Sequence, residues 1–318
     1  MELTVIIVNW NNCDMLKDCL YSLKQNTDSH NIEIIVVDNA SRDGSSKMVE
    51  TLFPDIHIIN SGSNIGFGRA NNLAINHAKT KLIFFLNPDT IVRENTLRDM
   101  IDFMNSNPQV GALQCKMKYR DGKVQELGIQ WFPTPLTELL STLLISEKTM
   151  PIIGRLLPYK DHNTSGYVSK LYGGNLMVRR EVIEQVGSFD ERFFMYGEDV
   201  DLCRRITDAG WKLYYLSTAE IVHLIGGASE KASSNFSALM RCESISKLMQ
   251  KYYGNTGAIS YRIVIFSGSI FRLLISSVLK IVSSLSKTGY DVNYRNTCRK
   301  YIAMIKWCLN LQKPEIKV

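Results

Sequence analysis

Short apolar runs alternate with amphipathic segments along the N-terminal part of the chain. Residues 3–8 (LTVIIV) and 33–37 (EIIVV) are rich in β-branched side chains and too short for core helices, which predicts buried parallel strands. Between them, leucines recur at the spacing of one helical face, so the three segments together predict a β-α-β unit. The same rhythm continues with expected helices at 45–53 and 67–79 and expected strands at 56–59 and 81–86. This alternation is typical of a parallel sheet covered by helices on both faces.

The pattern loosens after residue 108 and predicts a mixed second half. An Asp-Gly pair at 121–122 indicates a turn between extended segments, and two prolines in WFPTPLTELL argue against regular structure there. Further along, the sequence predicts helices at 179–187, 198–209 and 234–252 and extended segments at 212–216 and 220–224. We therefore expect an α/β protein, with a Rossmann-like mixed sheet flanked by helices and a C-terminal helical extension.

Positive charge is concentrated at the C-terminal end. Residues 251–318 hold eleven Lys or Arg and two acids, a net charge of +9. Because the whole chain has a net charge of +6, residues 1–250 have a net charge of −3. Within this end, residues 261–285 are largely apolar but are interrupted by Arg262, Arg272 and Lys280, whereas a membrane-spanning helix needs about 20 apolar residues. We expect this segment to lie on an anionic membrane surface with its apolar side in the headgroup region. The alternative is a core helix of the main domain whose cations reach solvent.

Composition and cysteine usage favour an intracellular globular protein. The 318 residues are 45% hydrophobic and 21% charged, as in ordinary globular chains. Seven cysteines form no CxxC pair and are odd in number, which favours reduced thiols over disulfides or structural zinc. The N-terminus lacks the basic start of a signal peptide. We expect a cytoplasmic location, with peripheral association at the inner face of the plasma membrane, and no nucleic-acid partner.

Four predicted strands end in polar clusters. In open α/β sheets, ligands bind outside the carboxyl ends of the strands, so these clusters are candidate binding residues. The clusters are NWNN at 9–12, DNASRDGS at 38–45, NSGSNIGFGRANN at 60–72 and NPD at 87–89. They predict one ligand site along a single edge of the sheet.

Individual residues in these clusters suggest particular chemistry. Asp38 directly follows a strand and can accept hydrogen bonds from a base imide or a ribose hydroxyl, although a helix cap is the alternative. GFGRAN lacks the third glycine of the dinucleotide fingerprint, so its glycines more simply allow close backbone approach, with Arg69 as a phosphate contact. Asp89 could supply an oxygen to Mg²⁺ or Mn²⁺, and a type I turn is the alternative.

Several of these stretches together resemble a known enzyme family. Their order and spacing are similar to those of the family 2 glycosyltransferases of the GT-A fold, especially rhamnosyltransferase-like members. The stretches are 38–45, 64–72, 87–89, 173–175 and 194–201. The likeness runs from about residue 3 to residue 227 and implies a GT-A glycosyltransferase domain at 1–227. Residues 228–318 are then a C-terminal helical, basic extension at the membrane surface.

The resemblance implies a donor site and a metal site. The NPD triplet stands where such enzymes often carry a DxD metal motif, and Asn87 replaces its first Asp, so Asp89 is the chief carboxylate. Related enzymes place a histidine as a metal or diphosphate ligand where His223 ends a strand, and a hydrogen-bonded core histidine is the alternative. The expected donor-binding residues are Asn9, Asp38, Asn64, Gly66, Arg69 and Asn87, and the expected metal ligands are Asp89 and His223.

The stretch FFMYGEDVDLCRR (193–205) concentrates carboxylates beside aromatic side chains. The resemblance implies that Asp199 is the base that takes a proton from the acceptor hydroxyl, while Glu198 binds the acceptor or holds the loop. Asp201 is expected to brace the helix, since an acidic first turn also suits the helix dipole. Phe193, Phe194 and Tyr196 would form an acceptor wall. The expected acceptor-binding residues are Gly174, Asn175, Tyr196 and Glu198, and a tight bend is the alternative for the two glycines of YGGN.

The resemblance implies an inverting, metal-dependent hexosyltransferase. It would move a sugar, with rhamnose from a dTDP donor as the first candidate, onto a cell-surface glycan or a lipid-linked acceptor. A UDP-hexose or UDP-galactofuranose donor remains open, as does a non-catalytic sugar-binding or scaffold protein. A nucleotidyltransferase is disfavoured because NWNNCD has neither glycine nor cation, and an oxidoreductase is disfavoured by the broken glycine fingerprint.

Overall fold

The computed structural model describes residues 2–25, 32–125, 131–142, 161–224, 235–286 and 291–315. The chain forms two compact units. The sheet unit comprises residues 1–132 and 160–231, and the helical unit comprises residues 133–159 and 232–317. The expected boundary between residues 227 and 228 stays a prediction, but a segment from the middle of the chain belongs to the helical unit.

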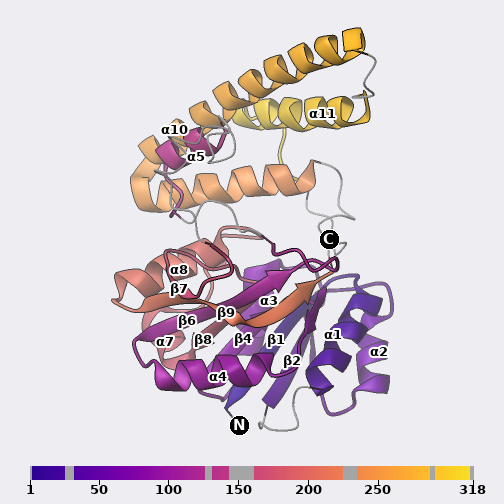
Figure 1. Cartoon of the computed structure of the whole chain (residues 1–318), viewed down its shortest axis with the longest axis vertical. Coiled ribbons are helices and arrows are strands. Elements are labelled where there is room, and N and C mark those ends of the chain that lie inside the picture. The colour runs from indigo at the N-terminus through magenta and orange to yellow at the C-terminus, as the bar shows by residue number, and fades with distance from the viewer. Residues whose placement is uncertain are drawn as a thin grey trace. The chain divides into compact units, whose positions relative to one another are not determined.

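The sheet unit is built on a nine-stranded mixed sheet (Figure 1). Its strands run in the order β3-β2-β1-β4-β8-β6-β9-β5, with β7 also paired to β9. Their bounds are Leu3–Asn9 (β1), Ile32–Asp38 (β2), His57–Asn60 (β3), Leu82–Leu86 (β4), Thr90–Val92 (β5), Val110–Lys118 (β6), Gly166–Val168 (β7), Asn175–Arg179 (β8) and Lys212–His223 (β9).

The four N-terminal strands β1 to β4 are parallel, as their sequence pattern predicts. They are β-branched and aromatic, and most of their side chains are buried because helices cover both faces. The register pairs Asn9 with Asp38 and Asp38 with Asn60. Three of the polar clusters therefore begin at the same edge of the sheet.

The second half of the sheet is mixed, which confirms the expected change of pattern. Strand β8 pairs antiparallel to β4 and β6, and β6 pairs parallel to β9. The two extended segments expected at 212–216 and 220–224 form the single strand β9, whose pairing with β6 shifts register between Cys115 and Lys116. The extended segment expected before the Asp-Gly turn is β6, whose nine residues do not alternate between buried and exposed because both faces are covered.

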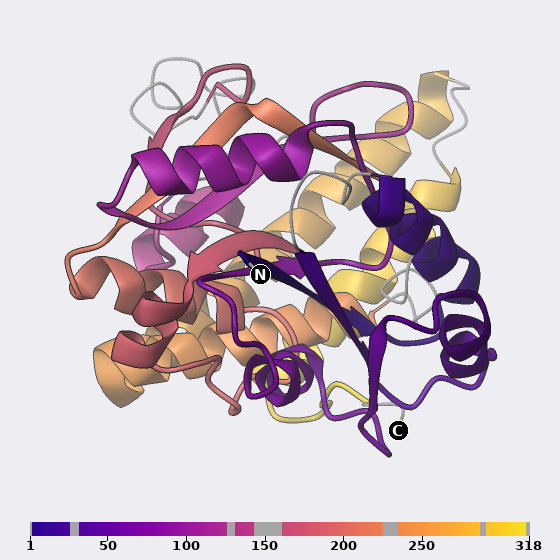
Figure 2. The same cartoon turned by 90° about the horizontal axis from the view of Figure 1, so that it is seen from below.

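Helices cover both faces of the sheet (Figures 1 and 2). One face packs against Cys13–Gln25 (α1), Ser45–Leu52 (α2) and Thr96–Ser106 (α4). The other face packs against Phe67–Ile75 (α3), Arg180–Val186 (α7) and Glu198–Asp208 (α8). Each helix supplies apolar side chains at helical spacing to one of two separate core clusters. The expected helices match these bounds closely, except that α3 is four residues shorter than expected.

The helical unit contains Pro135–Thr142 (α5), Phe236–Ser286 (α10) and Asp291–Cys308 (α11). Helix α10 breaks at Gly254, where the backbone is not helical. The expectation that two prolines exclude regular structure near 131–140 is wrong: Pro135 is the first residue of α5, where the missing N–H is not needed. By length and composition, residues Phe236–Ile281 of α10 could cross a membrane.

Candidate functional site

The ends of β1 and β2 form a connected polar group. Asn9 Nδ2 donates to Asp38 Oδ1 at 3.4 Å and to Ser41 Oγ at 3.1 Å, and the Ser41 amide donates to Asp38 Oδ2 at 3.0 Å. Asn9 and Asp38 are both buried. The carboxylate of Asp38 is therefore fixed at the strand end by two donors, in the place that the sequence predicts for a nucleotide contact.

Asn39 links this group to the next loop and was not singled out in the sequence. Its Nδ2 donates to Asn64 Oδ1 at 2.9 Å, and its Oδ1 accepts from the Ile65 amide at 3.0 Å. Asn39 is buried, so these bonds hold the loop after β3 against the loop after β2. Only its position beside Asp38 could have indicated this role, because its partners are more than twenty residues away.

Gly66 directly precedes α3 and has a backbone conformation that favours glycine. Its φ is 88°, and an added Cβ would lie 2.4 Å from the Phe194 carbonyl oxygen. The Phe67 amide donates to that same oxygen at 2.9 Å. The loop before α3 thus contacts the aromatic stretch before α8, which brings two of the predicted motifs together.

Arg69 lies on the exposed side of α3. Its Nε is 3.5 Å from Glu191 Oε2, and both side chains are about half exposed. Asn72 on the same helix donates to the Phe189 carbonyl oxygen at 2.9 Å and accepts from the Phe189 amide at 3.0 Å. Arg69 remains a candidate phosphate contact, while Asn72 holds the loop before α8.

The NPD triplet meets the YGGN stretch at the start of β8. The Asn87 amide donates to the Gly174 carbonyl oxygen at 3.0 Å. An added Cβ on Gly174 would lie 2.3 Å from the side chain of Asn87, so only glycine permits this approach. The group that approaches this glycine in the structure is Asn87, and its expected close approach to a sugar stays a prediction.

Asp199 is held by two backbone amides. Its Oδ2 accepts from the Gly173 amide at 3.0 Å and its Oδ1 accepts from the Val200 amide at 2.8 Å. The side chain is only partly exposed, and burial raises the pKa of its carboxyl above the ordinary value. A carboxylate that is fixed in orientation and more basic than usual suits a general base.

Glu198, the neighbour of Asp199, has an unusual environment. Its side chain is buried against Gly68 at the start of α3, and its Oε2 has no hydrogen-bond partner. Burial, and after it the charge of Asp199, raise the pKa of Glu198 well above its ordinary value of 4.5. This burial fits a residue that holds the loop better than one that binds an acceptor at the surface.

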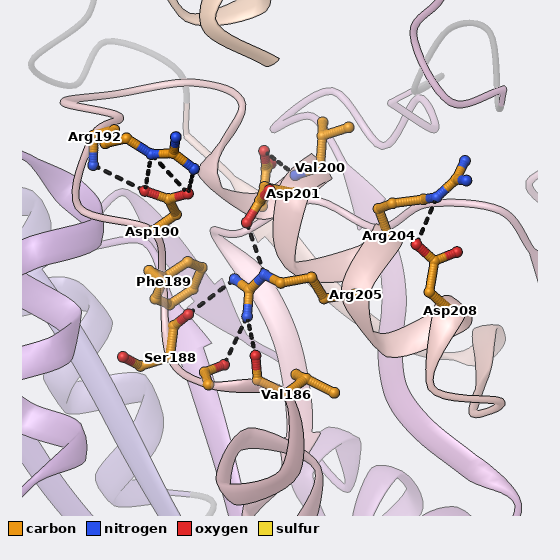
Figure 3. A network of polar contacts seen from close by, with 12 residues as sticks. Val186, Ser188, Phe189, Asp190, Arg192, Val200, Asp201, Arg204, Arg205 and Asp208 are labelled. Atoms are coloured by element: carbon orange, nitrogen blue, oxygen red, sulfur yellow. Dashed lines mark hydrogen bonds and ion pairs between the residues drawn. The ribbon is translucent and has the colours of Figure 1, made fainter. Parts of the chain in front are cut away.

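Asp201 braces its helix (Figure 3). Arg205 Nε donates to Asp201 Oδ2 at 2.8 Å, and the same guanidinium donates to the carbonyl oxygens of Val186, Gly187 and Ser188. Asp201 is fully buried. The pair fixes α8 to the loop after α7, which agrees with the bracing role expected for Asp201.

Two expected acceptor contacts are buried. The amide of Asn175 is inaccessible: Nδ2 donates to the Cys115 carbonyl oxygen at 2.8 Å, and Oδ1 accepts from the Cys115 amide at 3.4 Å. Asn175 therefore fills the register shift between β6 and β9 and does not face an acceptor. Phe193 is also buried, whereas Phe194 and Tyr196 are partly exposed, and Tyr196 has a φ of 66°.

Asp89 and His223 form a close pair. His223 Nε2 is 3.2 Å from Asp89 Oδ2, and the strands that carry them are paired through Thr90 and His223. His223 Nδ1 is 3.0 Å from Gln125 Oε1, which can only accept, so Nδ1 carries the ring proton in this contact. The other ring nitrogen, Nε2, is therefore the one that lies beside the Asp89 carboxylate.

These two residues fit part of a divalent metal site. Asp89 Oδ1 is buried without a hydrogen-bond partner, which leaves it free to coordinate. Among the described residues, no cluster of three or more His, Cys, Asp or Glu side chains surrounds them. Mg²⁺ and Mn²⁺ commonly complete their coordination with water and substrate phosphates, so a site with few protein ligands is ordinary for a nucleotide-dependent enzyme.

Unpartnered polar atoms mark the same region. Buried side-chain atoms without a partner are rare, and each calls for an explanation such as an absent ligand. Of the six such atoms in the described part of the chain, three belong to residues predicted from the sequence: Asn9 Oδ1, Asp89 Oδ1 and Glu198 Oε2. Asn9 ends β1, Asp89 follows β4, and Glu198 adjoins Asp199, whose carboxylate accepts from the Gly173 amide just before β8; that these residues form one site stays a prediction.

Comparison with known families and curated proteins points to one enzyme class. The model of glycosyl transferase family 2 matches residues 4–187, and a model described as the N-terminal domain of galactosyltransferase matches residues 160–225. The chain is 29% identical over 243 residues to the N-acetylglucosaminyl-diphospho-decaprenol L-rhamnosyltransferase of Mycobacterium tuberculosis, covering 70% of this chain and 75% of that protein. It is also 29% identical over 227 residues to rhamnosyltransferase WbbL of Escherichia coli, covering 69% and 82%.

Solved structures share the fold. The mannosyltransferase PcManGT from Pyrobaculum calidifontis, in complex with GDP-Man and Mn²⁺, superimposes with a TM-score of 0.59 and 15% identity, covering 98% of this chain and 86% of that chain. Residues 1–349 of TarS from S. aureus, in complex with UDP, superimpose with a TM-score of 0.54 and 16% identity, covering 98% and 83%. These likenesses confirm the expected GT-A fold.

Proposed function

This chain belongs to glycosyl transferase family 2, and we propose that it transfers a sugar with inversion, using Asp199 as the base and a divalent metal at Asp89 and His223. One observation carries the proposal. The Gly173 amide donates to Asp199, and the carbonyl of the adjacent Gly174 accepts from Asn87 of the NPD triplet. A single dipeptide therefore connects the candidate base to the candidate diphosphate site.

The reaction is a displacement at the anomeric carbon of the donor sugar. The acceptor oxygen forms a bond to that carbon while the bond from the carbon to the phosphate oxygen breaks, and its electron pair leaves with the nucleoside diphosphate. Asp199 takes the proton of the acceptor hydroxyl. Its two amide contacts fix both oxygens of the carboxylate, and its raised pKa makes it a stronger proton acceptor than an exposed Asp.

The donor nucleotide lies along the strand ends in this proposal. Asp38 accepts from the base or the ribose, and Asn9 offers its unpartnered Oδ1 beside it. Asn64 and Gly66 shape the loop through which the backbone approaches the donor, and Arg69 contacts a phosphate. Asn87 stands next to the diphosphate because it adjoins Gly174 and precedes Asp89.

The leaving diphosphate gains negative charge, which a cation must balance. Mg²⁺ or Mn²⁺, held by Asp89 and His223, would neutralise this charge and orient the phosphates. The buried, unpartnered Asp89 Oδ1 and His223 Nε2, in its neutral form, would supply the donor atoms. The structure of the mannosyltransferase PcManGT, which shares the fold, contains Mn²⁺ and GDP-Man, which supports a cation of this kind.

We assign rhamnose from a dTDP donor as the transferred sugar and a lipid-linked glycan as the acceptor. The support for rhamnose and for a lipid-linked acceptor comes from two relatives, an N-acetylglucosaminyl-diphospho-decaprenol L-rhamnosyltransferase and a second rhamnosyltransferase. A UDP-hexose or UDP-galactofuranose is the alternative donor. Such an acceptor lies at a membrane, and the proposal places this chain peripherally at the inner face of the plasma membrane.

A thermal-shift screen tests the donor assignment. A ligand that binds only the folded state stabilises it by about 2.7 kcal/mol at a hundredfold excess over its Kd. We expect dTDP-rhamnose to raise the melting temperature more than UDP-galactose or UDP-galactofuranose, and more with Mn²⁺ than without. A larger effect of a UDP-sugar would replace the donor, and no effect of any nucleotide sugar would refute the proposed function.

Product stereochemistry tests the reaction. Proton NMR of the glycan product should show an anomeric configuration opposite to that of the donor. Retention of configuration would contradict a single displacement with Asp199 as the base. Donor binding with no transfer to any lipid-linked acceptor would favour the non-catalytic alternative.

A further inference from the structure

We infer that the second half of α10, residues 255–286, lies flat in the headgroup region of an anionic bilayer and does not cross it. This inference rests on the membrane association in the proposed function and specifies how it is achieved. The helix is long and apolar enough to span a bilayer, so the direction of its side chains must decide between the two arrangements.

One face of this helix is apolar and exposed. Six side chains recur three, four or seven positions apart, which places them on a single face, and each is 40–62% exposed. We call these six residues the apolar stripe: Ile259, Ile263, Ile270, Leu274, Val278 and Ile281. From Ile259 to Ile281 the stripe extends over about 33 Å of helix, and none of its members is charged.

The opposite face is covered by α11, which runs beside this half of α10 (Figure 1). Tyr261 is buried there against the ring of Trp307. Two of the three cations that interrupt the apolar sequence contact α11 or the segment just after it: Arg262 stacks on Trp307 and donates to Asn310 Oδ1 at 2.7 Å, and Lys280 lies over the ring of Tyr294. Arg262 and Lys280 therefore contact α11 and are not members of the apolar stripe.

Helix α11 makes a crossing arrangement unfavourable. It carries four exposed cations, Arg295, Arg299, Lys300 and Lys306. Because α11 packs along α10, a crossing α10 would take these charges, together with Arg262 and Lys280, into the hydrocarbon core, where isolated charges are costly. A helix lying flat keeps all of them at the level of the headgroups while the apolar stripe enters the acyl region.

The positive charge of residues 255–318 indicates what kind of surface covers the apolar stripe. Between residues 255 and 318 there are ten Lys or Arg and only two acids, Asp291 and Glu315. A second copy of this chain would bring two strongly basic surfaces together, whereas an anionic bilayer complements the charge and accepts the apolar stripe at the same time. The occupant that the observations favour is therefore an anionic lipid surface, for which phosphatidylglycerol vesicles serve as the probe.

Tryptophan depth measurement tests the flat arrangement. Ile259, Ile270 and Ile281 are spaced eleven residues apart and share one face, so Ile259→Trp, Ile270→Trp and Ile281→Trp report both ends and the middle. We expect lipids brominated near the headgroup to quench all three added tryptophans equally. Stronger quenching of Ile270→Trp by bromines near the acyl terminus would show a crossing helix and overturn the inference.

Vesicle sedimentation tests the apolar stripe and the partner. Leu274→Glu should weaken binding to phosphatidylglycerol vesicles at least tenfold, whereas Leu52→Glu, at a half-exposed leucine of α2 in the sheet unit, should not. Binding of the full chain to vesicles of phosphatidylcholine alone should be weaker and less sensitive to salt. Unchanged binding of Leu274→Glu, or a lipid-free dimer that Leu274→Glu disperses, would overturn the inference.

The failure of this inference differs from the failure of the proposed function. Vesicle binding is measured without donor or acceptor, and transfer to a water-soluble acceptor analogue is measured without vesicles. Leu274→Glu should keep the transfer rate to the soluble analogue, since the apolar stripe lies outside the sheet unit. Loss of vesicle binding with retained transfer supports the inference, and loss of both would show that the variant is misfolded, in which case Ile263→Gln repeats the test.

Discussion

His223 Nε2 lies 3.2 Å from Asp89 Oδ2, although the two residues are far apart in the sequence. Asp89 directly precedes β5, whose first residue, Thr90, pairs with His223 at the end of β9. In the proposed function the pair would supply one carboxylate and one imidazole to a divalent cation, with substrate and water completing the coordination.

Loss of either member of this pair should weaken metal dependence. We expect Asp89→Asn and His223→Gln to raise the Mn²⁺ concentration for half-maximal transfer by about 10–100-fold, the usual effect of disturbing a metal site. Titration of transfer rate against Mn²⁺ measures this shift. His57→Gln, at an exposed position on β3, is the control, and an unchanged Mn²⁺ requirement in both site variants would remove them from the metal site.

Asp199→Asn should abolish the proton transfer and spare the donor. We expect kcat to fall by about 10²–10⁴-fold, because the amide keeps the size of the carboxylate but cannot take the proton. The dissociation constant for the nucleotide sugar, from calorimetry, should stay unchanged. In the unmodified enzyme, transfer should decline as the pH falls through the raised pKa of Asp199. A variant that retains its turnover would show that another group is the base.

Glu198→Gln should stabilise the protein at neutral and higher pH. Below the ordinary pKa of 4.5, folded and unfolded chains both hold the proton of Glu198; above it, the unfolded chain loses the proton and the folded chain keeps it, so stability falls as the pH rises. Gln removes this loss, which we expect to be about 1–3 kcal/mol near pH 8 and absent near pH 4. Urea unfolding across this range measures it, with exposed Glu94→Gln as the control. A gain that does not depend on pH would contradict the assignment.

Gly66→Ala and Gly44→Ala differ in both backbone strain and space. Both glycines have a positive φ, 88° and 85°, but Gly44 is left-handed helical, which costs Ala about 1–2 kcal/mol, whereas Gly66, with a ψ of 171°, is in a region that essentially only glycine adopts. Only the Cβ at position 66 meets an obstacle, the Phe194 carbonyl oxygen at 2.4 Å, whereas nothing lies within 4 Å at position 44. We expect the free energy of unfolding to fall by about 2 kcal/mol more for Gly66→Ala. Equal losses would show that the loop shifts freely away from Phe194.

The sequence predicts the parallel strands and their polar ends because register and burial follow from local pattern. Asp38 and Asp89 could be singled out since each follows an apolar run. The role of Asn39, the burial of Asn175 against Cys115 and the membership of α5 in the helical unit depend on partners distant in the chain. The direction of Arg262 and Lys280 was equally hidden, because periodicity alone does not say which face a neighbouring helix covers.

The Gly173–Gly174 dipeptide, just before β8, contacts both the proposed base, Asp199, and the proposed diphosphate-site residue, Asn87. Any substitution that moves the start of β8 changes the orientation of Asp199 and the setting of Asn87 together. Efforts to redesign the sugar specificity of this enzyme should therefore leave these two glycines unchanged, because a substitution at either would disturb the proposed base and the proposed diphosphate contact together.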